Sequence, residues 1–234
     1  MEIIFGMNPV KEAIKAGRRR VFEVMVAREQ YDDIVGLAKG IPINALSRRE
    51  LDTIAGIKHH QGVMAKVAPY PYADLTDLME LSSVVMLDSV EDPQNLGAVI
   101  RSAYALAGAG VVIPADRSAS VTPAVVKASA GAVEHALIAR VTNLRQAAKE
   151  LKKGGFWIIG LDAAAKEPLH AIPAFDKLAL VLGGEDAGLR PVMHKELDLV
   201  ASIPMRASFN SLNVAQSAAI ALYTLLHKEA GNRG

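Results

Sequence analysis

Three short polar clusters are the parts of this chain whose residue types could do chemistry. They span residues 88–101, 181–189 and 203–214, and each lies where an apolar run gives way to a loop. In sheets of parallel strands, ligands bind where the carboxyl ends of the strands meet the loops. Helix capping and turn formation need fewer polar groups than three clusters in one domain provide. The pattern therefore predicts a binding or catalytic site assembled from distant segments.

The first cluster places Arg101 four residues after Gly97, on an expected helix that begins near Asp92. Helical side chains lean toward the helix N-terminus, so the guanidinium should cross the gap at Gly97 and reach the loop at Asn95. A cation at that end opposes the helix dipole but suits a group that grips phosphate. A structural ion pair between Arg101 and Asp92 explains the spacing equally well, and the residues alone leave both interpretations open.

The second cluster puts glycines and a carboxylate directly after an apolar strand, in the order Leu182, Gly183, Gly184 and Glu185, with Gly188 close behind. Glycines at a strand end let a ligand approach the backbone closely. The spacing matches neither the GxGxxG dinucleotide fingerprint nor the glycine-rich phosphate loop of nucleotide-binding proteins. By itself this cluster is weak evidence, because glycine-rich turns after buried strands are common.

The third cluster places Ser211 and Asn213 at the start of the last apolar helix pattern. Short polar residues in that position usually cap the unpaired N–H groups of the first helical turn. A capped core helix and a functional role for the two side chains are both consistent with this stretch.

Strand and helix patterns alternate around the clusters. Strands are expected at 82–88, 111–113, 136–139, 156–161, 178–183 and 199–203, and helices after Asn95, at 122–129, at 142–153 and from Leu212 onward. Such alternation predicts an α/β fold with a parallel sheet and helices on both of its faces. Periodicity alone suggests an open doubly wound sheet, because knotted chains are rare.

The N-terminal part reads as a smaller α/β unit. Helices are expected at 8–17, 29–39 and 47–54, and strands at 21–27, 41–46 and 63–67. Asn8 is the expected N-cap of the first helix, and Gly17 is expected to end it. Residues 68–77 contain two prolines and no clear period, which indicates a linker. We therefore expect a small domain over residues 1–67, a linker over 68–80 and a larger domain over 81–234.

Composition excludes several classes of protein. With 234 residues, of which 51% are hydrophobic, the chain can bury a sizeable core, yet no apolar run approaches the roughly 18–20 residues that span a bilayer. The chain has no cysteine, and its six histidines lack metal-ligand spacing, so neither disulfides nor a metal are expected. The first residues resemble no secretion signal, which predicts a cytoplasmic protein without a membrane partner.

Charge is spread unevenly although the net charge is only +1. Residues 1–70 hold 11 Lys and Arg against 8 Asp and Glu, whereas residues 71–234 hold 15 against 17. A basic N-terminal part suits an anionic partner, and ordinary solvated surface explains the same imbalance.

Taken together, the motifs resemble the SpoU branch of the SPOUT RNA methyltransferases. The three family motifs correspond here to DPQNLGAVIRSA (92–103), VLGGEDAGL (181–189) and IPM…SLNVAQSAA (203–219), in that order. FGMNPVKEAI (5–14) and HHQGVMA (59–65) resemble the family's substrate-binding extension. The likeness is strongest to enzymes that methylate a guanosine 2′-hydroxyl in large-subunit ribosomal RNA.

The resemblance implies a C-terminal trefoil knot that holds S-adenosylmethionine, a homodimer and an N-terminal RNA-binding domain. The residues it assigns to catalysis are Asn95, Arg101, Glu185, Ser211 and Asn213. Those it assigns to the methyl donor are Leu182, Gly183, Gly184, Glu185, Gly188, Ile203, Met205, Leu212 and Asn213. For RNA we expect contacts from Arg18, Arg19, Arg20, Arg48, Arg49 and Lys58, mainly to phosphates, because only 5% of the residues are aromatic.

The reaction needs a ribose hydroxyl held in line with an activated methyl group while its proton departs. Arg101 matches the family's catalytic arginine by position. Guanidinium groups stay protonated in proteins, so a role in gripping phosphate and stabilising oxygen charge suits this residue better than a role as base. Asp186, Ala207 and Ala215 depart from the usual motifs and put individual pocket contacts in doubt.

Three other functions compete with this interpretation. A transfer RNA 2′-O-methyltransferase is disfavoured by the N-terminal extension, since minimal enzymes of that kind resemble the catalytic domain alone. A non-catalytic RNA-binding or ribosome-assembly protein on the same scaffold is disfavoured because Asn95, Arg101, Glu185, Ser211 and Asn213 are all retained. A nucleotide-dependent oxidoreductase would need a glycine fingerprint after Asp88, and that loop has none.

Overall fold

The structure is a computed structural model that describes residues 1–56, 60–184, 188–206 and 211–226. By its contacts the chain divides into two compact units. Unit 1 comprises Met1–Pro71 and Val121–His135, and unit 2 comprises Tyr72–Ser120 and Ala136–Gly234. The division after Pro71 falls inside the expected linker, and a segment from the middle of the chain belongs to unit 1.

Unit 1 is built on a four-stranded sheet in the order β1-β4-β2-β3. Its elements, with η for a 3-10 helix, are β1 (Glu2–Phe5), α1 (Met7–Ala16), β2 (Val21–Ala27), η1 (Arg28–Gln30), α2 (Asp32–Val35), β3 (Ile43–Leu46), α3 (Arg48–Ala55), β4 (Val63–Val67), α6 (Pro123–Ala128) and η2 (Ala132–Glu134). Strand β4 is antiparallel to β1 and β2, and β2 is parallel to β3. Met25, Leu51 and Met64 form a buried core under α3.

Local signals explain most helix ends in unit 1, and two expectations were wrong. The capping box between Ser47 and Glu50 starts α3 as predicted, and Gly17 ends α1 in the left-handed conformation. Helix α1, however, begins after Gly6, and Asn8 lies inside its first turn rather than capping it. The helix expected at 29–39 is only the two short turns η1 and α2, because Gly36 follows after a single helical turn.

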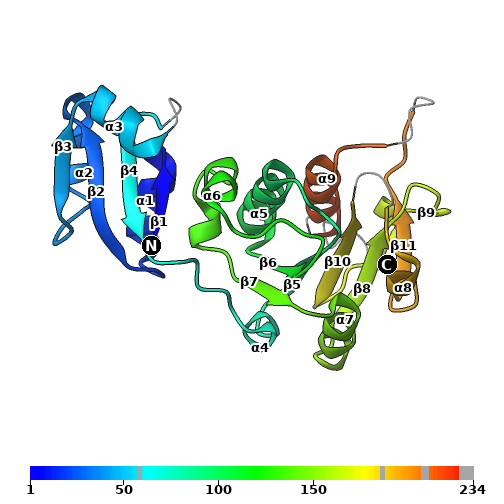
Figure 1. Cartoon of the computed structure of the whole chain (residues 1–234). Coiled ribbons are helices and arrows are strands. Elements are labelled where there is room, and N and C mark those ends of the chain that lie inside the picture. Colours follow the sequence, from blue (N-terminus) through cyan, green and yellow to red (C-terminus); the bar gives the residue numbers. More distant parts are fainter. Residues whose placement is uncertain (57–59, 185–187, 207–210, 227–234) are drawn as a thin grey trace, which may run out of the picture. The chain divides into compact units, whose positions relative to one another are not determined.

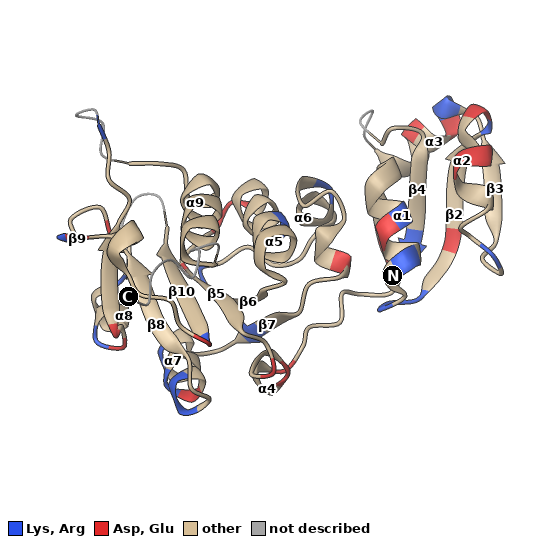
Figure 2. Cartoon of the chain, turned by 180° about the vertical axis from the view of Figure 1, so that it is seen from behind, with Lys and Arg blue, Asp and Glu red and all other residues tan. Residues whose placement is uncertain are grey.

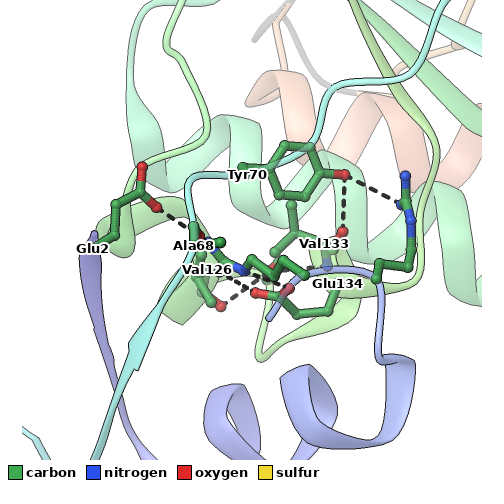
Figure 3. A network of polar contacts seen from close by, with 9 residues as sticks. Glu2, Ala68, Tyr70, Val126, Val133 and Glu134 are labelled. Atoms are coloured by element: carbon green, nitrogen blue, oxygen red, sulfur yellow. Dashed lines mark hydrogen bonds and ion pairs between the residues drawn. The ribbon is translucent and has the colours of Figure 1, made fainter. Parts of the chain in front are cut away.

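The segment 121–135 is fastened to the rest of unit 1 by a buried ion pair between Arg19 and Glu134 (Figure 3). Both side chains are only 1% exposed. Arg19 also donates to a carboxylate oxygen of Glu2 at 3.1 Å and to the Ala68 carbonyl at 3.2 Å. The Tyr70 hydroxyl donates to the Val133 carbonyl at 3.1 Å. Because the ion pair is desolvated and also hydrogen-bonded to other groups, its loss should be costly.

Unit 2 is organised around a seven-stranded sheet in the order β7-β6-β5-β10-β8-β11-β9. Its elements are α4 (Leu75–Leu78), β5 (Ser83–Asp88), α5 (Pro93–Ala107), β6 (Gly110–Pro114), β7 (Ile138–Val141), α7 (Leu144–Lys153), β8 (Trp157–Leu161), β9 (Glu167–Pro168), η3 (Leu169–Ala171), β10 (Leu178–Gly183), α8 (Pro191–His194), β11 (Leu199–Ser202) and α9 (Val214–Leu226). Every strand pair in it is parallel, which confirms the predicted α/β class. The sequence did not predict strands β1 and β9 or helix α8. It also did not predict α4, which lies within the expected linker and forms there because Asp74 and Asp77 make a capping box.

Helices cover both faces of this sheet (Figure 1). On one face α5 and α9 pack against each other and against the central strands. On the other face α7 and α8 bury the side chains Ala147, Ala148, Leu151 and Met193 against Val84, Met86, Val112 and Val181 of the sheet. The central strand β10 is buried from Leu178 to Leu182. A rigid sheet between two helical layers therefore holds the loops at its carboxyl edge.

Among the described residues, no helix has the length and apolar character needed to cross a membrane. The described His, Asp and Glu side chains form no group of three or more that could hold a metal ion.

Candidate functional site

A pocket of about 310 Å³ opens at the carboxyl ends of β8, β10 and β11. It is lined by Leu161, Asp162, Ala163, Leu182, Gly183, Gly184, Gly188, Leu189, Ile203, Met205, Ser211, Leu212, Val214 and Ser217. Its position follows the general rule that parallel sheets bind ligands at this edge, and its volume is typical of small-molecule sites. The structure thus brings the second and third polar clusters together around one cavity.

Glycines form the wall of this pocket because the backbone folds back on itself. The Gly188 N–H donates to the Gly184 carbonyl at 3.1 Å, and Gly188 has φ +60°, a conformation that favours glycine. A Cβ on Gly183 would overlap the carbonyl group of Gly188, and one on Gly184 would overlap the Ser89 carbonyl oxygen. Any side chain at these positions would therefore displace backbone that shapes the pocket.

Asn213 links the third cluster to the first. Its side-chain oxygen accepts from the Ala215 N–H at 2.9 Å, so it caps α9 as the sequence suggested. Its side-chain nitrogen donates to the side-chain oxygen of Asn95, at the start of α5, at 2.8 Å. Asn213 can therefore cap α9 and also contribute to the site, because its side-chain oxygen makes one contact and its side-chain nitrogen makes the other. Neither asparagine lines the pocket, although Asn213 lies between the lining residues Leu212 and Val214.

Arg101 is exposed on α5, six residues after Asn95 and therefore about 9 Å further along the helix axis. Asp92 caps α5 by accepting from the Gln94 N–H at 3.1 Å. Among the described residues Arg101 has no hydrogen-bond or ion-pair partner, so the structural clamp with Asp92 is not formed. The guanidinium is available to a ligand.

Several lining residues were missed by the sequence prediction: Leu161, Asp162, Ala163, Leu189, Val214 and Ser217. Leu161 ends β8, the neighbour of β10, and Asp162 follows it directly, so the strand-end rule could have found them. The Asp162 carboxylate accepts from the Ala164 N–H at 2.8 Å, which orients it in the turn after β8.

Of the remaining predictions, Glu185, Asp186 and Ala207 lie outside the described residues, and Ala215 is in the first turn of α9.

The residues expected to bind RNA differ in exposure. Arg20, Arg48 and Arg49 are exposed, and Arg18 is half-buried. Arg19 was a wrong prediction for an RNA contact, because its guanidinium is buried against Glu134. Figure 2 shows acidic and basic groups side by side on α3, where Arg48 forms an exposed pair with Glu29 at 2.6 Å. Lys58 lies outside the described residues.

Comparison with known proteins is consistent with this site. Residues 82–223 match the SpoU rRNA Methylase family, and residues 3–73 match the domain described as RNA 2'-O ribose methyltransferase substrate binding. The chain is 36% identical over 240 residues to YacO of Bacillus subtilis (strain 168), a protein named for the TrmH family of tRNA/rRNA methyltransferases. That match covers 97% of this chain and 96% of the relative.

Solved structures share the fold. The AdoMet-bound rRNA methyltransferase from Sinorhizobium meliloti aligns with a TM-score of 0.81 at 23% identity, covering 96% of this chain and 86% of that one. The SpoU methyltransferase AviRb from Streptomyces viridochromogenes, in complex with AdoMet, aligns with a TM-score of 0.80 at 24% identity, covering 99% and 91%.

The chain belongs to the SpoU methylase family. Membership defines an RNA 2′-O-methyltransferase. Two of the solved structures that share the fold hold AdoMet, the methyl donor S-adenosylmethionine. The structure fits such a donor for two reasons. The pocket has a suitable volume, and one of its walls is built of glycines at positions where a side chain would overlap the backbone.

The glycine wall can be tested by Gly183→Ala. The added Cβ overlaps the Gly188 carbonyl group, so the loop must move. We expect S-adenosylmethionine binding to weaken by about 1–3 kcal/mol, or roughly 5- to 150-fold, as measured by calorimetry. Gly36→Ala is the matched control, because Gly36 is helical and a Cβ there meets nothing within 4 Å. Unchanged donor affinity in Gly183→Ala would contradict the assignment of this wall.

Proposed function

We propose that the protein methylates a ribose 2′-hydroxyl of a guanosine in large-subunit ribosomal RNA. The observation that carries the proposal is the pocket at the carboxyl end of β10, to which the second and third clusters contribute directly and the first is joined through Asn95 and Asn213. S-adenosylmethionine supplies an activated methyl group when it is bound. Leu182, Gly183 and Leu212 would hold it in the pocket.

The polar side chains of the first and third clusters act on the RNA. Arg101 would grip a phosphate next to the target ribose and stabilise charge on the 2′-oxygen as its proton leaves to phosphate or solvent. Its exposure and lack of a partner among the described residues support this role. The Asn95–Asn213 hydrogen bond positions α5 against the start of α9, and Ser211 stands at the pocket itself.

Ribosomal RNA is favoured over transfer RNA by the N-terminal unit. Residues 3–73 match a substrate-binding domain, whereas a minimal transfer RNA enzyme would need only the catalytic domain. Exposed Arg20, Arg48 and Arg49 would contact RNA phosphates, which predicts binding that weakens as salt rises. A transfer RNA substrate is the second candidate, since the relatives are named for both kinds of RNA.

We also propose a homodimer with a knotted catalytic unit, formed through α5 and α9. Ile220 and Tyr223 share one face of α9 and are 40% and 60% exposed, and Tyr104 on the adjacent α5 is 39% exposed. Such apolar exposure is typical of an interface between subunits. The cytoplasmic location stays a prediction.

The dimer predicts that Tyr223→Glu shifts the protein from dimer to monomer, because a carboxylate would be buried without a partner. Light scattering after size exclusion measures the mass. Tyr31→Glu, at an exposed tyrosine of unit 1, should leave the dimer intact. A wild-type mass of one chain, about 24.9 kDa, would contradict the proposal.

The function itself is tested by transfer of label from S-adenosylmethionine to unmodified ribosomal RNA and transfer RNA. We expect label in large-subunit RNA only, at one linkage that resists alkaline hydrolysis because the 2′-hydroxyl is blocked. Label in transfer RNA would favour the second candidate. No label in either RNA, together with no donor binding by calorimetry, would favour the non-catalytic RNA-binding alternative.

A further inference from the structure

A second hollow, of about 440 Å³, lies at the carboxyl ends of β6 and β7. Its lining includes three arginines from three separate segments: Arg117 after β6, Arg145 in the first turn of α7 and Arg190 before α8. Asn143, the N-cap of α7, also lines it, so the positive end of that helix borders the hollow. Three arginines around one depression suit an anion, because guanidinium groups bind the oxygens of phosphate and carboxylate groups strongly.

Two of these arginines are held in place by buried carboxylates. The Nε of Arg190 donates to Asp88, which is fully buried and also accepts from the Arg190 backbone N–H at 2.9 Å. The Nε of Arg145 donates to Glu196, also buried, and this hydrogen bond lowers the pKa of Glu196 below its ordinary value of 4.5. Both contacts use Nε, and among the described residues the terminal Nη groups have no partner. The two guanidinium groups are therefore held in place by Nε, and their Nη groups can still donate hydrogen bonds to a ligand.

Arg117 is available without such an anchor. It is exposed, and within the described part of the chain it has no hydrogen-bond or ion-pair partner. Its φ of 55° is in the left-handed region, which is uncommon for a residue with a side chain and costs energy. Among the described residues that line the hollow, Asp116 is the one carboxylate. Counting the anchors and the nearby Lys149, four cations face three carboxylates, so the balance remains positive.

The hollow and the donor pocket lie along the same edge of the sheet. Leu189 lines the donor pocket and the next residue, Arg190, lines the hollow. Asp88, which anchors Arg190, pairs in register with Gly183 of the donor pocket. An RNA strand that presents a ribose at the donor pocket could therefore place a neighbouring backbone phosphate over the hollow.

We propose that Arg117, Arg145 and Arg190 form a binding site for a backbone phosphate of the substrate RNA, flanking the methylated nucleotide. This inference rests on the proposed function and adds a contact from the catalytic unit itself. Binding at this site should not depend on the RNA sequence, because the site recognises a phosphate and not the edge of a base. It positions the RNA, and the reacting atoms do not touch it.

The test is Arg117→Gly, which removes the guanidinium while keeping a residue that adopts positive φ without strain. The probe is an in vitro transcript of large-subunit ribosomal RNA. We expect its affinity to fall about tenfold, as for one lost hydrogen bond between charged groups. The slope of log Kd against log salt concentration should decrease by about 0.7–0.9, the value of one phosphate contact. The Kd for S-adenosylmethionine should not change.

Lys153→Ala is the matched control, because it removes one exposed positive charge at the other end of α7. It should bind the transcript as the wild type does. Equal behaviour of Arg117→Gly and the wild type, or an equal loss in both variants, would overturn the proposed site. A wild type that binds S-adenosylmethionine but neither binds nor methylates the transcript would instead overturn the proposed function, and the inference with it.

Discussion

Arg101→Ala is expected to lower the rate of methyl transfer to RNA about 10²- to 10³-fold, the usual effect of removing one preorganised donor to a developing oxygen charge. The side chain is exposed on α5, and among the described residues it makes no hydrogen bond or ion pair whose loss would destabilise the helix. Affinity for S-adenosylmethionine should therefore stay at the wild-type value, because Arg101 does not line the donor pocket. Single-turnover transfer and calorimetry measure the two effects separately.

Arg101→Lys separates charge from geometry. A lysine keeps the positive charge but loses the planar fork that binds two phosphate oxygens at once. We expect it to recover only a minor part of the lost rate. Near-complete recovery would show that charge alone is needed at this position. A loss of donor binding in Arg101→Ala would mean that the residue supports the pocket instead of the RNA.

The second large effect concerns the buried ion pair of unit 1. Glu134→Ala leaves the Arg19 guanidinium buried with a lost partner, and we expect the stability of unit 1 to fall by about 3–5 kcal/mol. Hydrogen exchange read by mass spectrometry resolves this effect, since peptides from residues 1–71 can be compared with peptides from the sheet of unit 2. Glu29→Ala is the matched control, because it removes a carboxylate from the exposed pair with Arg48 and should leave exchange nearly unchanged.

A double variant shows whether Glu134→Ala destabilises unit 1 by removing the attraction between Arg19 and Glu134 or by leaving the Arg19 charge buried without its partner. Replacing both partners, as Arg19→Met with Glu134→Leu, removes the buried charge along with the ion pair. We expect it to be more stable than Glu134→Ala alone, although Glu2 and the Ala68 carbonyl also lose a donor. If Glu134→Ala changed exchange no more than Glu29→Ala does, the ion pair would not be what fastens residues 121–135.

Local features were readable from the sequence because they depend on neighbouring residues. The alternation of apolar strands and helices predicted the α/β class, and the capping box at Ser47 and the glycine stop at Gly17 predicted helix ends. The three polar clusters were found because strand ends carry function in parallel sheets. The helix expected at 29–39 failed for the opposite reason, since a helical pattern that short is decided by packing and by Gly36.

By itself, then, the sequence determined the fold class, most of the elements and the three segments that carry the site. Only the tertiary structure decided which residues meet. Arg18, Arg19 and Arg20 are equivalent in sequence, and Arg19 alone is buried because Glu134 reaches it from 115 positions away. Asn95 and Asn213 are 118 positions apart, and the packing of α5 against α9 joins them. The arginine-lined hollow likewise exists because the order of strands in the sheet brings three distant loops to one edge, which no local pattern specifies.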